Sequence, residues 1–509
     1  MTRGAAWLGF TAMSIGMFMA ILDIQIVASS LPDIQAGLRI PRHVLNWVQT
    51  SYLIAEVIAI MLTGCLTPVL STGGLFTAAI AGFTLSSIGC AWSGSWQLLI
   101  LCRTIQGFCG GAIIPTVFSA GYKLFPPSLQ PRATLLAGSL AVLAPTLGPC
   151  LGGYITARYD WPWLFLVNVI PGVVVALLTG TLIRVDRADL AAWRRIDGAA
   201  AIALSLMLAA IELLLNRAPE QGWSSPEALL YLAAIPFLGA FGIAHCRSHP
   251  VPLIDLRLFT DRRFAAACGL SFVFGAGLYG SVYLLPLFLG FVRSHDSLEI
   301  GIIMTAMGAA QLLSAPLAAY ADQRWPAAVV AAFGMVLFAA GMIANGFETP
   351  RSDARELLSP QILRGCGVLL VMLPLTRIAL AGQPADRLAD ASAMVNLCRN
   401  LGGAIGIAVV DTISTNRAPR LANALGERLQ GGDRESAGFV GLPLARFHGT
   451  PLGPVSAADR DFVKPLIDHA AATLAFNEAW LVLGCSLGAA LLLIPLLRAS
   501  RMTRPSDLL

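Results

Sequence analysis

An arginine lies inside a strongly apolar segment of this chain. Arg103 occurs in the segment 101–112, and two acids, Asp23 and Glu56, lie within two other apolar segments. A charge at the centre of a bilayer costs about 3 kcal/mol or more, so an ionisable group that is kept there indicates a function. The plain alternative is a structural ion pair that only fixes how the helices pack.

Composition places the whole chain in a membrane. Of its 509 residues, 56% are hydrophobic and only 12% are charged, and apolar runs of about 20 residues recur throughout. The first run contains Asp23 and lacks a small-residue cleavage site, so we interpret it as a retained helix and not as a signal peptide. The sequence therefore predicts an all-α polytopic membrane protein.

The apolar runs predict fourteen spanning helices. Their approximate ranges are 7–31, 44–66, 73–93, 97–121, 133–156, 162–183, 197–216, 226–245, 264–290, 299–320, 327–346, 358–381, 391–415 and 473–497. With both termini in the cytoplasm, the inner segments hold sixteen Lys and Arg residues and the short outer loops seven. This asymmetry predicts cytoplasmic termini. A long outer loop at about 416–472 is expected to hold a short amphipathic helix near 420–430, or to be partly disordered.

Polar positions recur in the two ends of the chain. Arg103 is followed by Gln106 and Gly107, and Arg364 is followed by two further glycines; a glycine-rich helix comes next in each case. We therefore expect a six-helix half over 1–190, two inserted helices over 191–250 and a second six-helix half over 251–509.

Small residues also follow helical spacing. Gly148 and Gly152 lie four residues apart, as do Gly107 and Gly111 and the pair Gly402 and Gly406. Such residues let helix backbones approach closely in lipid, while the prolines at 145 and 149 remove backbone hydrogen bonds and bend the fifth helix. A gating interface and tight static packing explain this pattern equally well.

The buried charges are expected at different depths along the predicted helices. At about 1.5 Å per residue, Asp23 lies about 12 Å and Arg103 about 9 Å below the outer surface, so the two can pair. Glu56 lies about 18 Å deep with no partner at that level, which favours its neutral form. It is either a proton carrier or a permanently neutral group. Glu212, Asp411 and Glu478 are expected near the outer surface, where water solvates them, and Arg399 and Arg377 near the inner surface, where long side chains reach the interface.

Several function classes are not supported. Neither of the two lysines, Lys123 and Lys464, follows a glycine, so no phosphate-binding loop of an ATP-driven pump is present. Nearly all ten cysteines fall within predicted spans, and the six histidines lie at helix ends or in loops. We expect no enzyme, no metal, no cofactor and no nucleic-acid partner.

The chain resembles the major facilitator superfamily, in particular its fourteen-spanning drug:proton antiporters of the EmrB/QacA type. The matching positions are Leu22-Asp23, Ile26-Val27, Leu31-Pro32, the segment 47–52, Arg103 with Gln106-Gly107, Pro145, Gly148-Pro149 with Gly152-Gly153, Trp161, Phe165, Asn168, Asn396, Arg399 and 401–403. Gly148-Pro149 with Gly152-Gly153 corresponds to the antiporter motif and is the most specific match. One departure is Pro68, which replaces the acid of the loop after the second helix, so a charge latch is not expected there.

The resemblance implies a major facilitator fold and a proton-coupled exporter of small amphipathic organic compounds or drugs in the inner membrane. Asp23 and Glu56 would then carry protons or contact cationic substrate groups, and Arg103 would serve coupling, with Asn396, Arg399 and Arg364 as polar sites of the second half. A periplasmic adaptor and an outer-membrane channel are implied as partners where the host has two membranes. The alternative is a carrier of the same superfamily for a specific metabolite or a siderophore-like compound.

Overall fold

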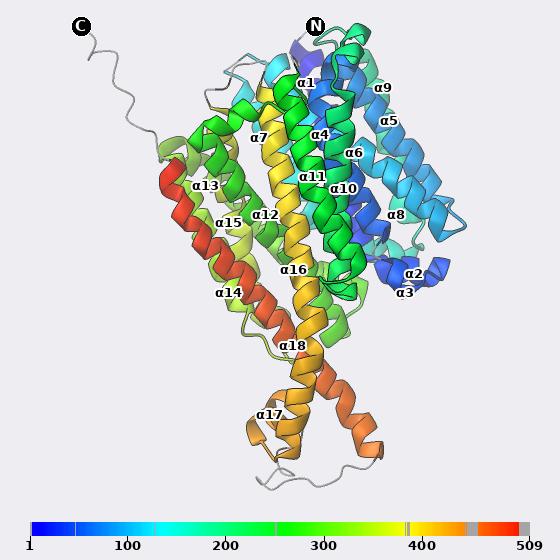
Figure 1. Cartoon of the computed structure of the whole chain (residues 1–509), viewed down its shortest axis with the longest axis vertical. Coiled ribbons are helices and arrows are strands. Elements are labelled where there is room, and N and C mark those ends of the chain that lie inside the picture. The colour runs from blue at the N-terminus through cyan, green and yellow to red at the C-terminus, as the bar shows by residue number, and fades with distance from the viewer. Residues whose placement is uncertain are drawn as a thin grey trace, which may run out of the picture.

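The chain forms a bundle of long helices with an extension at one end (Figure 1). The computed structural model describes residues 3–497 except 46, 127, 250–251, 382, 384–386, 443 and 445–456. Within this part of the chain no strand occurs. The helices are α1 (Arg3–Ser29), α2 (Leu31–Leu38), α3 (Arg42–Leu45), α4 (Trp47–Leu70), α5 (Thr72–Ala91), α6 (Trp96–Leu124), α7 (Gln130–Arg158), α8 (Trp163–Leu166), α9 (Val169–Leu182), α10 (Gly198–Gln221), α11 (Pro226–Ser248), α12 (Arg262–Leu287), α13 (Ser297–Arg324), α14 (Ala327–Asn345), α15 (Ala354–Leu380), α16 (Leu388–Gln430), α17 (Arg434–Val440) and α18 (Ala457–Ala490).

The number of spans agrees with the prediction of fourteen. Thirteen helices of the described chain are long and apolar enough to cross a membrane, with α8 and α9 together making one of them. The fourteenth span is α7, whose segments Arg132–Pro145 and Leu147–Arg158 are bent by 44°. The prolines at 145 and 149 explain the bend, because neither ring nitrogen can donate to the preceding turn.

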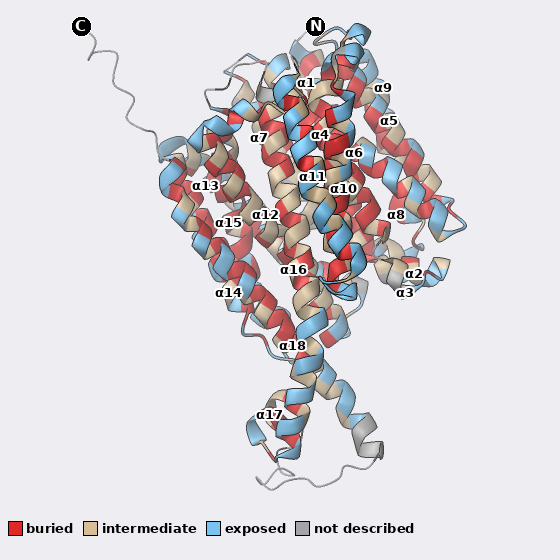
Figure 2. Ribbon diagram, in the orientation of Figure 1, coloured by how far each residue is buried: buried red, intermediate tan, exposed pale blue. Residues whose placement is uncertain are grey.

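Buried residues recur along the helices of the bundle (Figure 2). The buried apolar side chains form several groups. Two neighbouring groups combine residues of α1, α4, α5, α6, α7 and α9, and a third, larger group combines residues of α12 to α16 and α18. A smaller group from α4, α10, α11 and α16 lies between them. Among the thirteen straight spans α1 is the most buried and α11 the least, so α1 lies centrally and α11 faces the lipid.

The segment at 416–472 is largely helical, which corrects the expectation of a long loop. The structure has no separate short helix near 420–430, because these residues continue α16 to Gln430. With α17 and the first part of α18 they form a helical extension, opposite the end where α1 begins (Figure 1). Leu421, Leu425 and Leu429, spaced by four residues, pack in an apolar core with Val440 of α17 and Ala470 of α18. The part of the expected loop at 445–456 lies outside the described residues, as do three of the basic residues counted as inner, Arg498, Arg501 and Arg504.

The ends of three helices of the first part are held together by one acid. Asp186, just after α9, accepts hydrogen bonds from the Thr72 backbone nitrogen (2.8 Å) and hydroxyl (2.6 Å) and from Lys123 Nζ (2.9 Å). Thr72 begins α5 and Lys123 lies in the last turn of α6. Although Pro68 replaces the acid expected in this loop, a charged contact from another segment therefore fixes the same end. The comparable contact in the second part joins Asp322 of α13 to Arg377 of α15 at 3.0 Å.

The contacts of Asp186 predict a contribution to stability that depends on pH. Burial alone would raise the pKa of Asp186, but the hydrogen bonds from Thr72 and Lys123 and the charge of Lys123 outweigh burial and lower the pKa. The stabilisation is therefore present above the ordinary carboxyl pKa of about 4 and is lost as the pH falls below it. Because both side chains are partly exposed, we expect Asp186→Asn to cost only about 1 kcal/mol at pH 7.

Thermal unfolding in detergent at pH 7 and at pH 3.5 checks this expectation. The difference between wild type and Asp186→Asn should shrink at the lower pH. Asp189→Asn is the matched control, since Asp189 only caps a short helix through the Ala191 nitrogen. A difference that is the same at both pH values would contradict the assignment.

Candidate functional site

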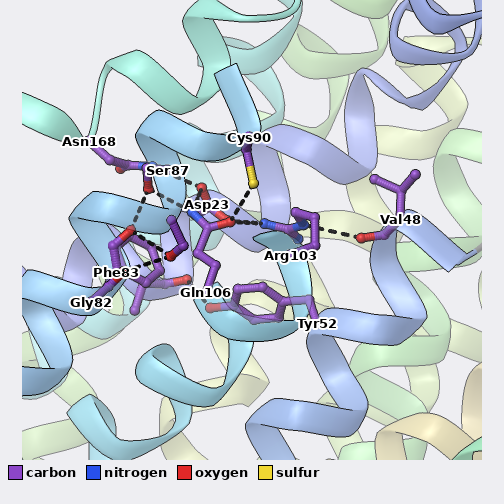
Figure 3. Close-up of polar contacts among 12 residues, drawn as sticks. Asp23, Val48, Tyr52, Gly82, Phe83, Ser87, Cys90, Arg103, Gln106 and Asn168 are labelled. Carbon is purple, nitrogen blue, oxygen red and sulfur yellow. Dashed lines mark hydrogen bonds and ion pairs between the residues drawn. The ribbon is translucent and has the colours of Figure 1, made fainter. Parts of the chain in front are cut away.

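The predicted ion pair between Asp23 and Arg103 is present at the centre of the first part of the chain (Figure 3). Asp23 lies on α1 and Arg103 on α6, and Nη1 of the arginine donates to Oδ2 of the aspartate. Both side chains are completely buried. Each charge is thus removed from solvent and neutralised by the other, which is the condition under which a buried pair is tolerated.

Two amides complete the surroundings of the Asp23 carboxylate. Gln106 Nε2 donates to Asp23 Oδ1 at 3.0 Å, and Asn168 Nδ2 donates to the same oxygen at 2.8 Å. The Gln106 amide also donates to the Ser87 hydroxyl of α5 at 2.8 Å. Because Arg103 and Gln106 lie on α6 and Asn168 lies at the junction of α8 and α9, the acid on α1 is held by groups from two other parts of the bundle. We call Asp23, Arg103, Gln106 and Asn168 the Asp23 cluster.

The guanidinium of Arg103 is fixed from several sides. Its Nε donates to the Val48 carbonyl of α4 at 3.1 Å, and its Nη1 donates to Gln106 Oε1 at 2.8 Å. The Tyr52 ring lies 4.3 Å from Cζ and the Phe165 ring 5.8 Å, both within the range of cation–π attraction. These contacts hold the arginine at a defined level between α4 and α6.

Glycines of α6 make this arrangement sterically possible. A Cβ at Gly107 would collide with the Tyr52 backbone (Cα at 2.7 Å), and one at Gly110 would collide with the Tyr52 hydroxyl. The same helix face continues with Gly111, whose Cβ would meet the Glu56 backbone (carbonyl carbon at 2.9 Å). The close approach of α4 to α6 brings the Tyr52 ring over Arg103 and places Glu56 one turn further along α4.

Glu56 occupies a different electrostatic position from Asp23. Its residue exposure is only 4%, and within the described residues its carboxyl group forms no hydrogen bond or ion pair. The charges of Arg103 and of Arg399 on α16 both act on it. Glu56 is therefore within electrostatic reach of an arginine of the first part of the chain and of one of the second.

The residues of the antiporter motif form the contact between α7 and α1. A Cβ at Gly148 would meet the Gln25 side chain, and one at Gly152 would meet the Ile26 carbonyl oxygen at 2.7 Å. Gly153 is buried, and Pro145 and Pro149 lie at the bend of α7. On another face of α7, a Cβ at Gly301 of α13 would lie 2.7 Å from the Pro149 carbonyl oxygen. The motif thus joins the bent helix closely to α1 and to α13.

The predicted polar residues of the second part are not brought into one cluster. Arg399 donates to Asn396 Oδ1 one turn earlier on α16, and Asn396 donates to the Ser392 carbonyl at 2.9 Å. The charge of Arg399 also acts on Glu56 of α4. Arg364 on α15 is completely buried, and its guanidinium lies 4.7 Å from the Trp480 ring of α18.

The two arginines that the sequence places at matching positions therefore have different surroundings. Within the described structure, none of the three side-chain nitrogens of Arg364 has a hydrogen-bond partner. Arg103, by contrast, has an acid, an amide and a backbone carbonyl as partners. The repeated sequence pattern predicted two buried arginines, but only the first is built into an acid–base cluster.

A family model of the Major Facilitator Superfamily matches residues 13–407 of the chain. The chain belongs to the major facilitator superfamily. It is 37% identical over 409 residues to the "Colistin resistance protein EmrB" of Acinetobacter baumannii and 31% identical over 409 residues to the "Multidrug export protein EmrB" of Escherichia coli (strain K12), in both cases over 80% of each chain. Within the superfamily the chain is thus of the EmrB type, and it is a transporter and not an enzyme.

The fold is also similar to solved superfamily structures. The crystal structure of the human organic anion transporter MFSD10 (TETRAN) superposes with a TM-score of 0.62 at 13% sequence identity, over 96% of this chain and all of that one. At this identity the likeness shows the fold alone. The helix arrangement of this EmrB-type chain is therefore that of the superfamily.

The surroundings of two buried polar residues, Asn168 and Glu212, could not be predicted from the sequence. Asn168 was identified only as a family match, and no spacing argument could link it to Asp23, 145 residues earlier. Glu212 was set aside as solvated, because α10 was expected to end near residue 216. The helix runs to Gln221, so Glu212 lies deeper and is only 5% exposed.

The packing of the antiporter motif predicts different outcomes for two glycines of α7. Gly152→Ala should cost about 1–3 kcal/mol, because its Cβ would meet the backbone of α1 within 3 Å. Gly138→Ala should leave stability unchanged or raise it, since nothing lies within 4 Å of its Cβ and alanine favours the helix. Thermal unfolding in detergent measures both, and equal losses in the two variants would contradict close packing at Gly152.

The two buried arginines should also respond differently to replacement by methionine. Arg103→Met leaves Asp23 as a buried charge without its counter-ion, and we expect it to cost about 3–5 kcal/mol. Arg364→Met removes a buried charge that has no acidic partner in the described structure, so stability should stay the same or rise. Denaturation in mild detergent measures both variants. A loss at Arg364 as large as that at Arg103 would show that Arg364 has a charged partner after all.

Proposed function

We propose that this EmrB-type chain is a proton-coupled antiporter that exports small amphipathic organic compounds, drugs among them, across the inner membrane. The observation that carries the proposal is the Asp23 cluster, a completely buried acid–base pair in a transporter. Its similarity to a multidrug export protein and to a colistin resistance protein supports export of drug-like compounds.

The geometry supports a specific coupling step. When Asp23 takes up a proton it loses its charge, and its attraction for Arg103 falls sharply in surroundings of low dielectric. Arg103 is then drawn more strongly towards Glu56, on which its charge already acts. Since Asp23 is held by α6 and by the α8–α9 junction, a change of partner at Arg103 alters contacts among α1, α4 and α6. Proton uptake would in this way bias how these helices are arranged.

The bundle supports a division of labour among its parts. We propose that residues 1–190 and 251–509 act as two six-helix halves, with the helices of 191–250 as an insert. The separate apolar groups of the two regions favour this division. Substrate would bind at mid-membrane between the halves, beside α1, α4, α6, α7 and their counterparts. The contact of Pro149 with Gly301 joins α7 to α13 across the proposed boundary and makes the antiporter motif part of the moving interface.

Orientation and partners form the remaining part of the proposal. The excess of basic residues on the side where α1 begins favours cytoplasmic termini and an extension that faces outward. A helical extension with its own apolar core offers a surface for a periplasmic adaptor, which in turn would connect to an outer-membrane channel.

Transport by proteoliposomes under an imposed pH gradient tests the coupling. We expect the gradient to drive ethidium movement by wild type, and Asp23→Asn to lower the driven rate to that of empty liposomes, because the variant cannot carry the proton. Glu56→Gln should lower it as well. Asp468→Asn is the matched control: Asp468 is exposed in the extension, and its side chain forms no hydrogen bond or ion pair with the described residues.

Each result decides a separate point. Equal gradient-driven rates in wild type and Asp23→Asn would remove Asp23 from the mechanism, and a wild-type rate that is indifferent to the gradient would remove antiport. Competition by chemically unrelated drugs supports a multidrug exporter, whereas competition by close analogues of one compound alone would favour the metabolite or siderophore-like carrier.

A further inference from the structure

A buried acid on the inserted helix α10 has no role in the scheme above. Glu212 is 5% exposed, and within the described chain its carboxyl group forms no hydrogen bond or ion pair. A carboxyl group that is buried in this way is costly unless it stays neutral or meets a cation. Because Glu212 lies on one of the two inserted helices and not on one of the twelve other spans, its burial bears on what the inserted helices do.

The register of α10 against α4 places Glu212 beside Glu56. Asn216 Nδ2 donates to the Thr50 hydroxyl of α4 at 2.8 Å, and the Arg217 guanidinium lies 5.5 Å from the Trp47 ring. As the seventh and second spans, the two helices run in opposite directions. Glu212 lies four residues, or about 6 Å, deeper than this contact along α10, and Glu56 six residues, or about 9 Å, deeper along α4. The two carboxyl groups therefore differ in depth by about 3 Å, and they repel each other electrostatically.

Charged groups from every neighbouring helix define the environment of the two acids. Arg399 and Asp411 lie on α16. Arg103, already paired with Asp23, lies on α6. Tyr279, which interacts with both Arg399 and Glu56, lies on α12.

Other charged groups lie nearer the ends of these helices. Towards the outer end, Tyr283 donates to Asp411 at 2.8 Å, and Glu220 of α10 acts on this pair. Arg217 of α10 pairs with Glu227 of α11 at 3.3 Å, and His245 of α11 lies 3.5 Å from Asp197 at the other end of α10.

Charge balance shows what such a site can hold. With both acids ionised, Glu56 and Glu212 carry two negative charges, and Arg399 supplies one positive charge near Glu56. One unit of negative charge then remains, so the site is neutral when it holds one monovalent cation. The simplest such cation is a proton that the two carboxyl groups share, as neighbouring acids do when they cannot both ionise.

We propose that Glu212 of the inserted helix and Glu56 of α4 form a two-carboxyl site that binds either one proton or the cationic group of a substrate, but not both. The inference rests on the proposed function and deepens it, because it makes cationic amphipathic compounds the substrate class of this site. Binding of a monovalent lipophilic cation displaces the shared proton, which leaves for solvent, so that charge is conserved. The inserted helices then contribute half of the exchange site.

Proton release on binding tests the proposal directly. Tetraphenylphosphonium is titrated into the purified full-length protein at pH 7 in two buffers of different ionisation enthalpy, which gives the number of protons released per cation bound. We expect about one proton for wild type. For Glu212→Gln we expect release to approach zero and the affinity to fall at least about tenfold, as for the loss of a buried charge. Glu56→Gln and the double variant should behave like Glu212→Gln, because both acids belong to one site.

Three comparisons separate charge from structure. Glu212→Asp keeps the carboxyl group and should restore release and most of the affinity. Glu227→Gln, at an exposed acid of the adjacent inserted helix, should match wild type. Binding of the neutral dye Nile red should be unchanged in all variants that keep the wild-type unfolding temperature.

The contrary outcomes are equally defined. Wild-type affinity and release in Glu212→Gln would overturn the proposal, as would a wild type that does not bind the cation, or a Glu212→Asp variant as defective as Glu212→Gln. The liposome assay reports separately on the proposed function: normal proton release without gradient-driven transport would defeat antiport and leave the two-carboxyl site standing.

Discussion

A carboxylate can remain charged inside a lipid-facing bundle only while other groups supply its hydrogen bonds and its counter-charge. Asp23 obtains these from Arg103, Gln106 and Asn168, which come from two other segments of the chain. The position of those segments and the protonation of one side chain are therefore linked. Any rearrangement that withdraws a donor favours protonation, and protonation in turn releases the donors. This reciprocity is the physical basis on which a helical bundle can convert a proton gradient into movement.

The two completely buried arginines, Arg103 and Arg364, differ in their electrostatic surroundings. The first part surrounds its arginine with an acid and amides, whereas the second part packs Arg364 against Trp480. Arg399, also in the second part, acts electrostatically on Glu56 of the first. Within the described chain, the buried acid–base contacts are thus concentrated around Asp23 and Glu56.

Much of this architecture could be predicted from the sequence, because hydrophobic length determines spans in a membrane. The span count, the pairing of Asp23 with Arg103 and the bend of α7 followed from apolar runs, depth and proline chemistry. The surroundings of each polar group could not be predicted. Asn168 is remote in sequence from its partner, and Glu212 was assigned to the surface because α10 continues five residues past its predicted end. The extension was expected to be a loop because alanine, glycine and charged residues surround the regularly spaced leucines that form its helical core.

The length of α16 has a mechanical consequence. It is one uninterrupted helix of 43 residues, which carries Arg399 within the bundle and ends at Gln430 in the extension (Figure 1). The distance from Arg399 to Gln430 is about 46 Å at 1.5 Å per residue, so each degree of tilt about Arg399 displaces the tip by about 0.8 Å. The helix is in effect a lever, with the arginine near its fulcrum. A small change in the tilt of α16 that follows a change of charge at Glu56 would therefore cause a larger displacement at Gln430, in the extension.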